Sequence, residues 1–563
     1  MASIAKKVKK GRTYYYAVES ARVEGKPRIV WQKYLGTIDA IVERAEKAKP
    51  PRPKETVIFE AGGVAALLRI GERLKVMELI NKAVPKREQG PSVGHYLLLA
   101  AINRALSPRS KVEIGDWYEE TVLRRLWRFP KSSFSSQRFW DHMDMVSGKA
   151  IERIQEELAL RIKKEFGIDE QTLLYDTTNF FTFLATSNDR CDLAQRGHSK
   201  AKRHDLRQVG LALLVTGKYQ VPLFHRVYPG NLPDVSIFPQ LAKELIGRYH
   251  KILKTSAEAT LVFDKGNLSD EAMERIVVSG QHFVAAVTAN RVPHLLSAPL
   301  TQFEELPGLP GTKAFAQEET FWGKQSLFVV SYTESFFTQQ LNGVTHNLVK
   351  CQKKLLDLEK GLIKWRAGKA RGQRPTVRGV KASANRILSP QFMKDLFEIK
   401  VEQEKGLPFL QYALKHDELD RLSNQRLGRT VLVTDHTDWN SKKAISSYRS
   451  LTQIEDAFKN MKNVDFLRWQ PAYHWTDQKL KVHGFYCVLA LLLATLARKV
   501  AIQAGIELSL PELLKELSAI REVAVIYPQG TLAHRKDHIT LSRMSPRQRK
   551  LAQCLEIAPV LGG

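Results

Sequence analysis

The stretch Tyr448-Arg-Ser-Leu-Thr-Gln-Ile-Glu-Asp-Ala-Phe-Lys-Asn-Met-Lys462 has the spacing of one helix with two different faces. Its apolar side chains recur at intervals of three or four residues, which predicts a face packed on a core. These side chains are Leu451, Ile454, Phe458 and Met461. Tyr448, Glu455 and Lys462 recur every seven residues on a neighbouring face, and Lys459 follows Glu455 by one turn. A carboxylate beside a phenol and two ammonium groups is suited to holding a metal ion next to a phosphate backbone.

Length and charge limit the class of protein. A chain of 563 residues is expected to divide into several domains. Lys and Arg number 87 against 59 Asp and Glu, a net charge of +28 that predicts a polyanionic partner, most simply nucleic acid. A membrane surface is the weaker alternative, since no basic amphipathic anchor stands out and the apolar run 485–497 is too short to span a bilayer. The N-terminus lacks a hydrophobic signal segment, which predicts a cytoplasmic, nucleoid-associated protein.

The pattern along the chain predicts a mixed α/β protein with helical parts on either side. A β-hairpin is expected over 13–35, and periodic Leu, Ile and Val indicate helices from about 57 to 165. Strands and helices then alternate between 173 and 287, and a further strand over 429–434 leads into the helix at 441–462. The predicted units are 1–54 (β-hairpin and basic linker), 55–168 (helical, DNA-binding), 169–289 (α/β core, first part), 290–428 (β-rich and basic insert), 429–475 (α/β core, second part) and 476–563 (C-terminal helical region).

Two aspartates each follow an apolar strand of the predicted sheet. Asp176 comes after Leu173-Leu-Tyr, and Asp264 comes after Ala259-Thr-Leu-Val-Phe. Aspartates at the carboxyl edge of a sheet are well placed to converge on a ligand. With Glu455 from a packed helix they would supply the oxygen ligands that Mg²⁺ prefers, and phosphoryl transfer uses such a site. The alternative is that both aspartates are turn formers, as most aspartates in loops are.

Several blocks of the sequence carry a family resemblance. They are Gln453-Ile-Glu-Asp-Ala-Phe-Lys459 within Tyr448…Glu455…Lys462, Arg196-Gly-His-Ser-Lys200, Pro222-Leu-Phe-His-Arg-Val-Tyr-Pro-Gly-Asn231 and Pro471-Ala-Tyr-His-Trp475. With these blocks the chain resembles the DDE transposases of bacterial insertion sequences, in the cut-and-paste subclass that has a Tyr-Arg-Glu-Lys signature on its last catalytic helix. The resemblance extends over most of the chain.

The resemblance implies a ribonuclease-H-like mixed-sheet core, interrupted by a β-rich insert before the glutamate. It implies that Asp176, Asp264 and Glu455 are the catalytic, metal-binding triad, and that Tyr448 and Lys462 are signature residues that contact DNA. The implied cofactor is Mg²⁺, for which Mn²⁺ is a possible substitute. The implied partner is double-stranded DNA, both terminal inverted repeats and target, and a homodimer is expected because two ends must be paired.

The signature is incomplete in this chain. Leu451 occupies the position of the signature arginine, and Thr452 stands where the family often has an aromatic residue. Arg449 is the nearest arginine and is a candidate for DNA contact, as is Lys459. It precedes Glu455 by six residues, about 240° around a helix, so it cannot replace the missing side chain. These departures concern the grip on DNA near the cleaved end, including any hairpin intermediate, and leave the triad unaffected.

Basic segments elsewhere are further candidates for DNA contact. Arg196, Lys200, Lys202, Arg203 and Arg207 form a cluster between predicted strands, for which phosphate binding and a solvated loop are the alternatives. Residues 360–386 contain nine Lys or Arg and no acid, as expected either of a flexible DNA-clasping arm or of a solvated charge run. Residues 135–144 have serine caps before an aromatic, basic face, as in a recognition helix or a plain bundle helix.

Three functions remain compatible with these residues. The first is a DNA transposase that cleaves element ends and transfers the 3′-ends into target DNA. The second is a catalytically inactive DNA-binding derivative, which Leu451 favours and the intact carboxylate set opposes. The third is a ribonuclease-H-like nuclease that cuts without strand transfer.

Overall fold

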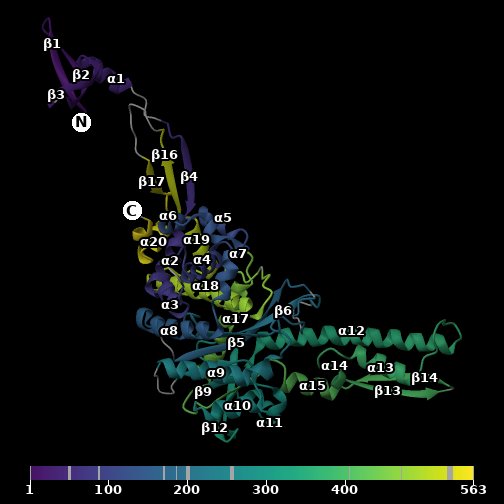
Figure 1. Ribbon diagram of the computed structural model, residues 1–563. Coiled ribbons are helices and arrows are strands. Elements are labelled where there is room, and N and C mark those ends of the chain that lie inside the picture. Colours follow the sequence, from purple (N-terminus) through teal and green to yellow (C-terminus); the bar gives the residue numbers. More distant parts are fainter. Residues whose placement is uncertain are drawn as a thin grey trace.

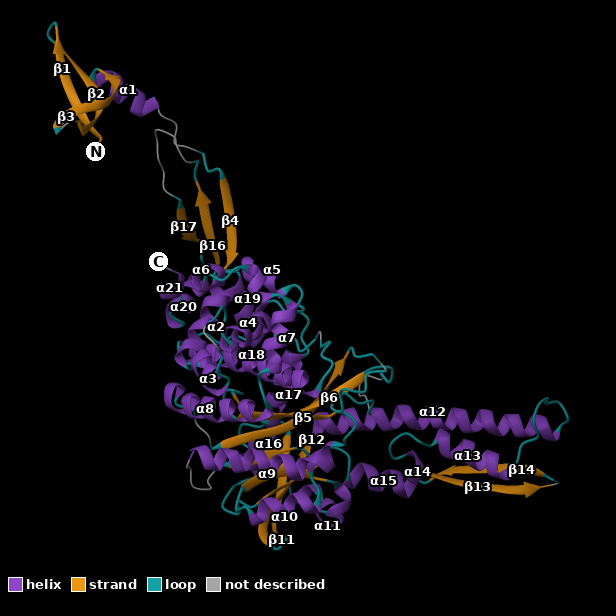
Figure 2. Cartoon of the chain, viewed as in Figure 1, coloured by secondary structure: helices purple, strands orange, loops and turns teal. Residues whose placement is uncertain are grey.

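The structure is a computed structural model of the chain. It describes residues 2–23, 25–47, 52–86, 89–168, 171–185, 187–197, 203–253, 259–404, 406–470, 472–528 and 537–561. Figures 1 and 2 show a central body of helices and sheet, with a small sheet at one end and a long helical arm at the side.

One mixed sheet organises the body. Its strands, in spatial order within the described part of the chain, are β10 (Glu304–Glu305), β11 (Thr312–Phe321), β12 (Lys324–Thr333), β15 (Arg429–Thr434), β9 (His282–Val287), β8 (Thr260–Phe263), β5 (Thr172–Thr182), β6 (Arg207–Thr216) and β7 (Pro222–Pro229). β5, β8 and β9 run parallel to one another, whereas β6, β7 and β15 pair antiparallel with their neighbours. β6 is buried at every residue after its first, which explains its almost continuous apolar sequence.

Helices cover both faces of this sheet. α9 (Asp234–Leu253) lies against one face, where its Phe238 packs on the rings of Tyr175 and Phe263. The next residue of β5, Asp176, points to the opposite face because side chains alternate along a strand. That second face carries α16 (Ser441–Arg449) and α17 (Leu451–Met461). α10 (Asp270–Val278) connects β8 to β9 and packs beside α9, and α11 (Pro293–Leu296) follows β9.

The helices before and after the sheet form one body rather than two separate regions. They are α2 (Gly62–Arg73), α3 (Val76–Ala83), α4 (Val93–Leu106), α5 (Ile114–Glu119), α6 (Leu123–Trp127), α7 (Ser136–Asp144), α8 (Gly148–Phe166), α18 (Asp477–Gln503), α19 (Leu510–Ser518), α20 (Pro546–Cys554) and α21 (Ala558–Leu561). α18 lies at the centre, in contact with α2, α4, α7 and α8. α18 is long and apolar enough to cross a membrane, but 83% of its most apolar window is buried among these helices, as in a core helix.

The expectation that 57–165 and 476–563 are helical is wrong at the start of the first region and between α19 and α20 in the second. β4 (Glu55–Glu60), β16 (Arg521–Ile526) and β17 (His538–Leu541) form a three-stranded antiparallel sheet. β4 and β16 lie more than 450 residues apart in sequence, so local patterning had little power to pair them.

The expected hairpin near the N-terminus is present as β2 (Arg12–Val23) and β3 (Lys26–Gly36). A third strand, β1 (Ala2–Lys9), pairs with β2, and α1 (Ile38–Lys47) follows the sheet. β1 was not expected because its lysines resemble a charged tail. Of the predicted Pro-rich linker, residues 49–51 lie outside the described part of the chain.

The insert is not β-rich as predicted. Its first hairpin, β11–β12, joins the main sheet through β15. The remainder is a mostly helical arm composed of α12 (Glu334–Arg366), α13 (Val377–Ile387), α14 (Met393–Leu396), β13 (Phe397–Glu404), β14 (Leu407–Leu414) and α15 (His416–Gln425). Figure 1 shows α12 projecting far from the body.

Candidate active site

The register of two parallel strands brings the two aspartates together. Thr172 of β5 pairs with Thr260 of β8, and Leu174 pairs with Val262. Continued by two residues, the same register places Asp176 beside Asp264, on strands about 4.8 Å apart. Asp264 directly follows β8, as expected. Asp176 does not close its strand, because β5 continues to Thr182 and pairs with β6 along its whole length.

The helix expected over 441–462 is divided at Ser450 into α16 and α17. The backbone N–H of Ser450 is shared between the carbonyls of Ser446 and Ser447, each at 3.2 Å, and the Ser450 hydroxyl donates to the Ser447 carbonyl at 2.5 Å. Such a serine bond to the preceding turn is a known cause of helix bending. The predicted apolar face is confirmed, since it is buried in the core. Its members are Leu451, Ile454, Phe458 and Met461.

Tyr448 connects the helix pair to the strand aspartates. Its hydroxyl donates to Oδ1 of Asp264 at 2.7 Å. The pKa of Tyr448 is raised, first by burial and then by the charge of Asp264 and this hydrogen bond. The charges of Glu455 and Asp176 raise the pKa further, so both carboxylates lie within electrostatic range of the same phenol. The Tyr448 phenol thus contacts Asp264 directly and lies within electrostatic range of Glu455 and Asp176, and it stays protonated and continues to donate.

Lys462 lies on the same face of β5, immediately after α17. Its ammonium donates to the Thr178 hydroxyl at 2.7 Å and lies 5.4 Å from the centre of the Phe180 ring. Thr178 follows Asp176 by two residues, so both side chains project to one side of the sheet. We did not predict Thr178 as a site residue; the two-residue period from Asp176 was the signal for it.

An aromatic stack holds the segment after α17 against the same strand. Trp469 is fully buried and stacks on Phe180 with ring centres 4.5 Å apart and planes 10° apart. The carbonyl of Trp469 accepts a hydrogen bond of 2.8 Å from Nε2 of the buried His483, whose Nδ1 contacts His474 at 2.9 Å. Burial holds the pKa of both histidines well below the ordinary value, so the pair is neutral.

Two residues predicted to contact DNA from the helix pair have protein partners. Lys459 is 70% exposed and pairs with Asp456 at 2.9 Å, which leaves it at the surface beside Glu455. Arg449 donates to the Thr312 hydroxyl of β11 at 2.9 Å. That bond holds it on the insert strand, in agreement with its placement away from the Glu455 face.

Arg207, a described member of the basic cluster after β5, is not near Asp176. Arg207 begins β6 opposite Thr182, six residues along the ladder from the Asp176–Leu213 pair, which is about 20 Å. Arg207 also donates to the Asn188 carbonyl at 2.9 Å, and the exposed Arg203 pairs with Asp205 at 2.8 Å. Lys200 lies outside the described residues.

The segment proposed as a recognition helix forms α7. Ser135 caps it as predicted, accepting a hydrogen bond from the Arg138 backbone. Phe139 and Met143 are buried in the helical body, and Trp140 remains 39% exposed. α7 is thus a packed bundle helix with one exposed aromatic side chain.

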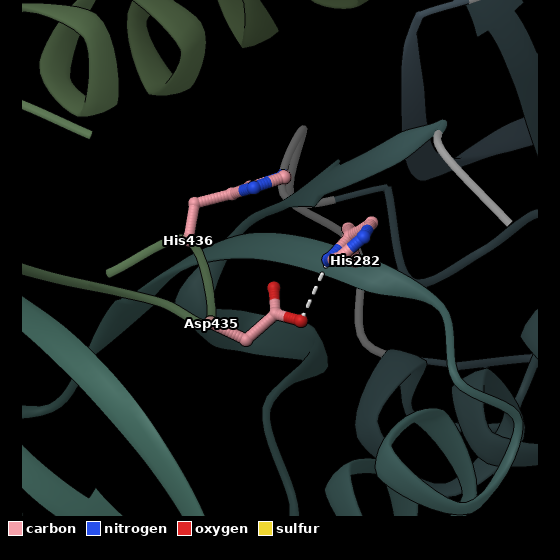
Figure 3. Close-up of side chains that lie close together, drawn as sticks. All are labelled: His282, Asp435 and His436. Carbon is pink, nitrogen blue, oxygen red and sulfur yellow. Dashed lines mark hydrogen bonds and ion pairs between the residues drawn. The ribbon is translucent and has the colours of Figure 1, made fainter. Parts of the chain in front are cut away.

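A second polar cluster lies at the opposite end of the parallel strands (Figure 3). Asp435, whose side chain is fully buried, contacts Nδ1 of His282 at 2.8 Å and the ammonium of Lys324 at 2.5 Å. His436 offers a third potential metal ligand. However, the two imidazole rings are stacked at 4.3 Å, so their in-plane lone pairs run side by side and do not meet at one ion. With Lys324 already neutralising Asp435, the cluster is better described as a buried ion pair that ties β12, β9 and the end of β15 together.

Comparisons with known proteins give slight likenesses. No protein-family model matches the sequence, nor does any curated protein sequence. Among solved structures, a cryo-EM structure of the piggyBac transposase synaptic complex with hairpin DNA is 11% identical, covering 80% of this chain and 79% of that chain with a TM-score of 0.36. The Mos1 transposase paired-end complex with the left transposon end is 10% identical, covering 35% of this chain and 60% of that chain with a TM-score of 0.15. Both of these structures are transposases.

Proposed function

We propose that this chain is a DNA transposase of the DDE type, from a bacterial insertion sequence of the cut-and-paste subclass. The observation that carries the proposal is the register that brings Asp176 beside Asp264, together with the hydrogen bond from Tyr448 to Asp264, which joins them to the helix pair that carries Glu455. The strand order β7-β6-β5-β8-β9, with an antiparallel meander followed by parallel strands, supports a ribonuclease-H-like core. In that core the aspartates occupy adjacent strands, and the glutamate comes from a helix on the same face.

The donor set suits a hard divalent cation. Carboxylate oxygens are the ligands that Mg²⁺ prefers, and Mn²⁺ accepts the same set. Asp176, Asp264 and Glu455 are the residues that would hold it. When bound, such ions activate water or a 3′-hydroxyl and stabilise the leaving oxygen of a phosphodiester. Tyr448 occupies one oxygen of Asp264 and so leaves Oδ2 to face the site.

The remaining residues of the site serve the substrate. Lys459 and Lys462 follow Glu455 by one and two helical turns and would place positive charge beside a scissile phosphate held there. The excess of 28 positive charges over the chain fits a DNA substrate, here the terminal inverted repeats and the target duplex. Two copies of the chain would pair the two ends, in the cytoplasm, where the nucleoid is accessible.

The experiment uses purified full-length protein with Mg²⁺ and duplexes that carry the inverted repeats flanking the gene. The parent should cleave these ends and join the 3′-ends to a target plasmid. Asp264→Asn should lose cleavage by more than about a thousandfold, because it removes a ligand of the reacting centre. The control Asp189→Asn changes an exposed carboxylate and should leave the rate unchanged.

Each outcome selects one function. Cleavage that survives Asp264→Asn rejects the catalytic assignment. Cleavage without joining selects the nuclease, and DNA binding without cleavage by the parent selects the inactive derivative. Leu451 is the residue that favours the inactive derivative, and with 8% exposure its side chain belongs to the core.

A further inference from the structure

The arm formed by residues 334–425 is a folded unit with its own core. α12 has 33 residues and is therefore about 50 Å long. A hydrophobic cluster that includes Val344, Leu355, Ala384 and Phe397 fills the space between α12, α13 and the β13–β14 hairpin. A smaller cluster of Leu362, Val380 and Leu410 does the same near the tip. The acid-free stretch 360–386 thus lies on a packed scaffold, and not on the flexible segment expected from its charge.

The basic charges of the arm are concentrated in one exposed stretch. All nine basic residues of the acid-free stretch are exposed. They are Lys360, Lys364, Arg366, Lys369, Arg371, Arg374, Arg378, Lys381 and Arg386. Among the described residues, only Arg366 of these nine forms an ion pair, with Glu404 at 3.7 Å. The neighbouring strand β13, in contrast, turns charges of both signs to solvent: Glu398, Lys400, Glu402 and Glu404.

In α13 the basic side chains and the apolar side chains lie on opposite sides of the helix. Val380, Ala384 and Ile387 face the arm core, while Arg378, Lys381 and Arg386 occupy the opposite side of the same helix. An ordinary solvated surface mixes charges of both signs. A folded surface on which eight of nine basic residues form no ion pair among the described residues fits an anionic partner that is extended and repetitive.

We propose that the basic side of this arm, α13 with the end of α12 and the connection between them, binds the phosphate backbone of duplex DNA. The contact is independent of base sequence because flexible lysines and arginines on a convex surface meet phosphates and do not enter a groove. Figure 1 shows α12 and α13 extending away from the body that contains β5 and α17, so the basic side of the arm adds affinity for DNA without taking part in cleavage. The inference rests on the proposed function only in that DNA is the polyanion.

The test measures the salt dependence of DNA binding by the full-length protein. Fluorescence anisotropy with a long random-sequence duplex gives the slope of log K against log salt concentration. The arm variant replaces five basic residues with Gln: Lys364, Lys369, Arg371, Arg378 and Lys381. The control variant replaces the same number and types of exposed residues on the helical body: Lys149, Lys164, Lys515, Arg543 and Arg549.

Each lost phosphate contact flattens the slope by about 0.9, so loss of all five contacts in the arm variant should flatten it by about 4.5, and the control should flatten it by less than about 1. Unchanged thermal melting of both variants establishes that the fold is intact. A slope equal to the parent's, or equal flattening by both variants, overturns the proposal. Asp264→Asn distinguishes DNA binding by the arm from cleavage at the carboxylates. This variant should keep the parental salt slope, and its cleavage rate tests only the proposed function.

Discussion

Removal of one oxygen atom, in Tyr448→Phe, tests the geometry of the site. The lost bond is a 2.7 Å donation to a carboxylate, and a hydrogen bond to a charged group contributes about 1.5–3 kcal/mol. Each 1.36 kcal/mol changes a rate tenfold, so if the bond holds Asp264 in its reacting position, cleavage should slow by about tenfold to about 150-fold. DNA affinity should change little, because the Tyr448 hydroxyl is already engaged by Asp264.

The assay is single-turnover nicking of a labelled duplex end at saturating protein and Mg²⁺. Tyr473→Phe is the matched control, because Tyr473 is 53% exposed and removal of its hydroxyl should alter the rate less than about twofold. Because the pKa of Tyr448 is raised above the ordinary value near 10, the ratio of parental to variant rates should stay constant up to about pH 10. A parental rate in Tyr448→Phe, or a ratio that collapses between about pH 8 and pH 10, would refute the reasoning.

Three further predictions concern stability, and each is measured by urea unfolding. Asp435→Asn should lower the free energy of unfolding by about 1.5–3 kcal/mol at neutral pH, because it weakens a buried charge-assisted hydrogen bond and leaves the Lys324 ammonium, 34% exposed, without its charged partner. Burial alone would raise the pKa of Asp435, but Lys324, the Phe283 amide and His282 lower it, so the difference should persist down to about pH 4 and vanish below the folded pKa. His483 is neutral when folded, but in the unfolded chain it binds a proton below about pH 6.5. The free energy of unfolding should therefore fall on its account by about 1.4 kcal/mol for each unit that the pH drops below about 6.5. His483→Gln should remove that part of the pH dependence. Leu451→Arg should cost about 3 kcal/mol without speeding cleavage, whereas Leu451→Met should cost less than about 1.5 kcal/mol; an Arg variant as stable as the parent would show that the position can accept the signature residue.

The local parts of the fold were predictable from periodicity. The apolar stripe of α17 and the end of β8 at Asp264 follow from spacings of three to four and of two residues. The bend at Ser450 was not predictable in this way, because it depends on one serine hydroxyl competing for a carbonyl of the preceding turn. The site is therefore assembled by two helices, with Tyr448 on one and Glu455 on the other.

The long-range strand pairings could not be predicted from the sequence, for a different reason. β4 pairs with β16 across most of the chain, and β12 pairs with β15 around the whole arm. Alternation along a single strand does not specify its partner. Arg207 shows the same difference between sequence and space. It follows Asp176 on the next strand of the sheet, but it lies at the far end of the β5–β6 ladder.

The arm shows that composition alone describes a surface poorly. Nine basic residues without an acid are typical of a disordered segment, yet Val380 and Leu362 recur at the positions that anchor them to a core. The expectation of a flexible arm was wrong, because the apolar residues between the charges pack into the core of the arm.

Uptake of Mn²⁺ tests the central claim most directly, because it reports the carboxylate site without any need for turnover. In complex with a duplex end, the parent should remove free Mn²⁺ from the electron paramagnetic resonance spectrum at micromolar concentrations. Asp176→Asn, Asp264→Asn and Glu455→Gln should each weaken this uptake at least about tenfold, and Asp189→Asn should not change it. Parental Mn²⁺ binding by all three site variants would contradict the account.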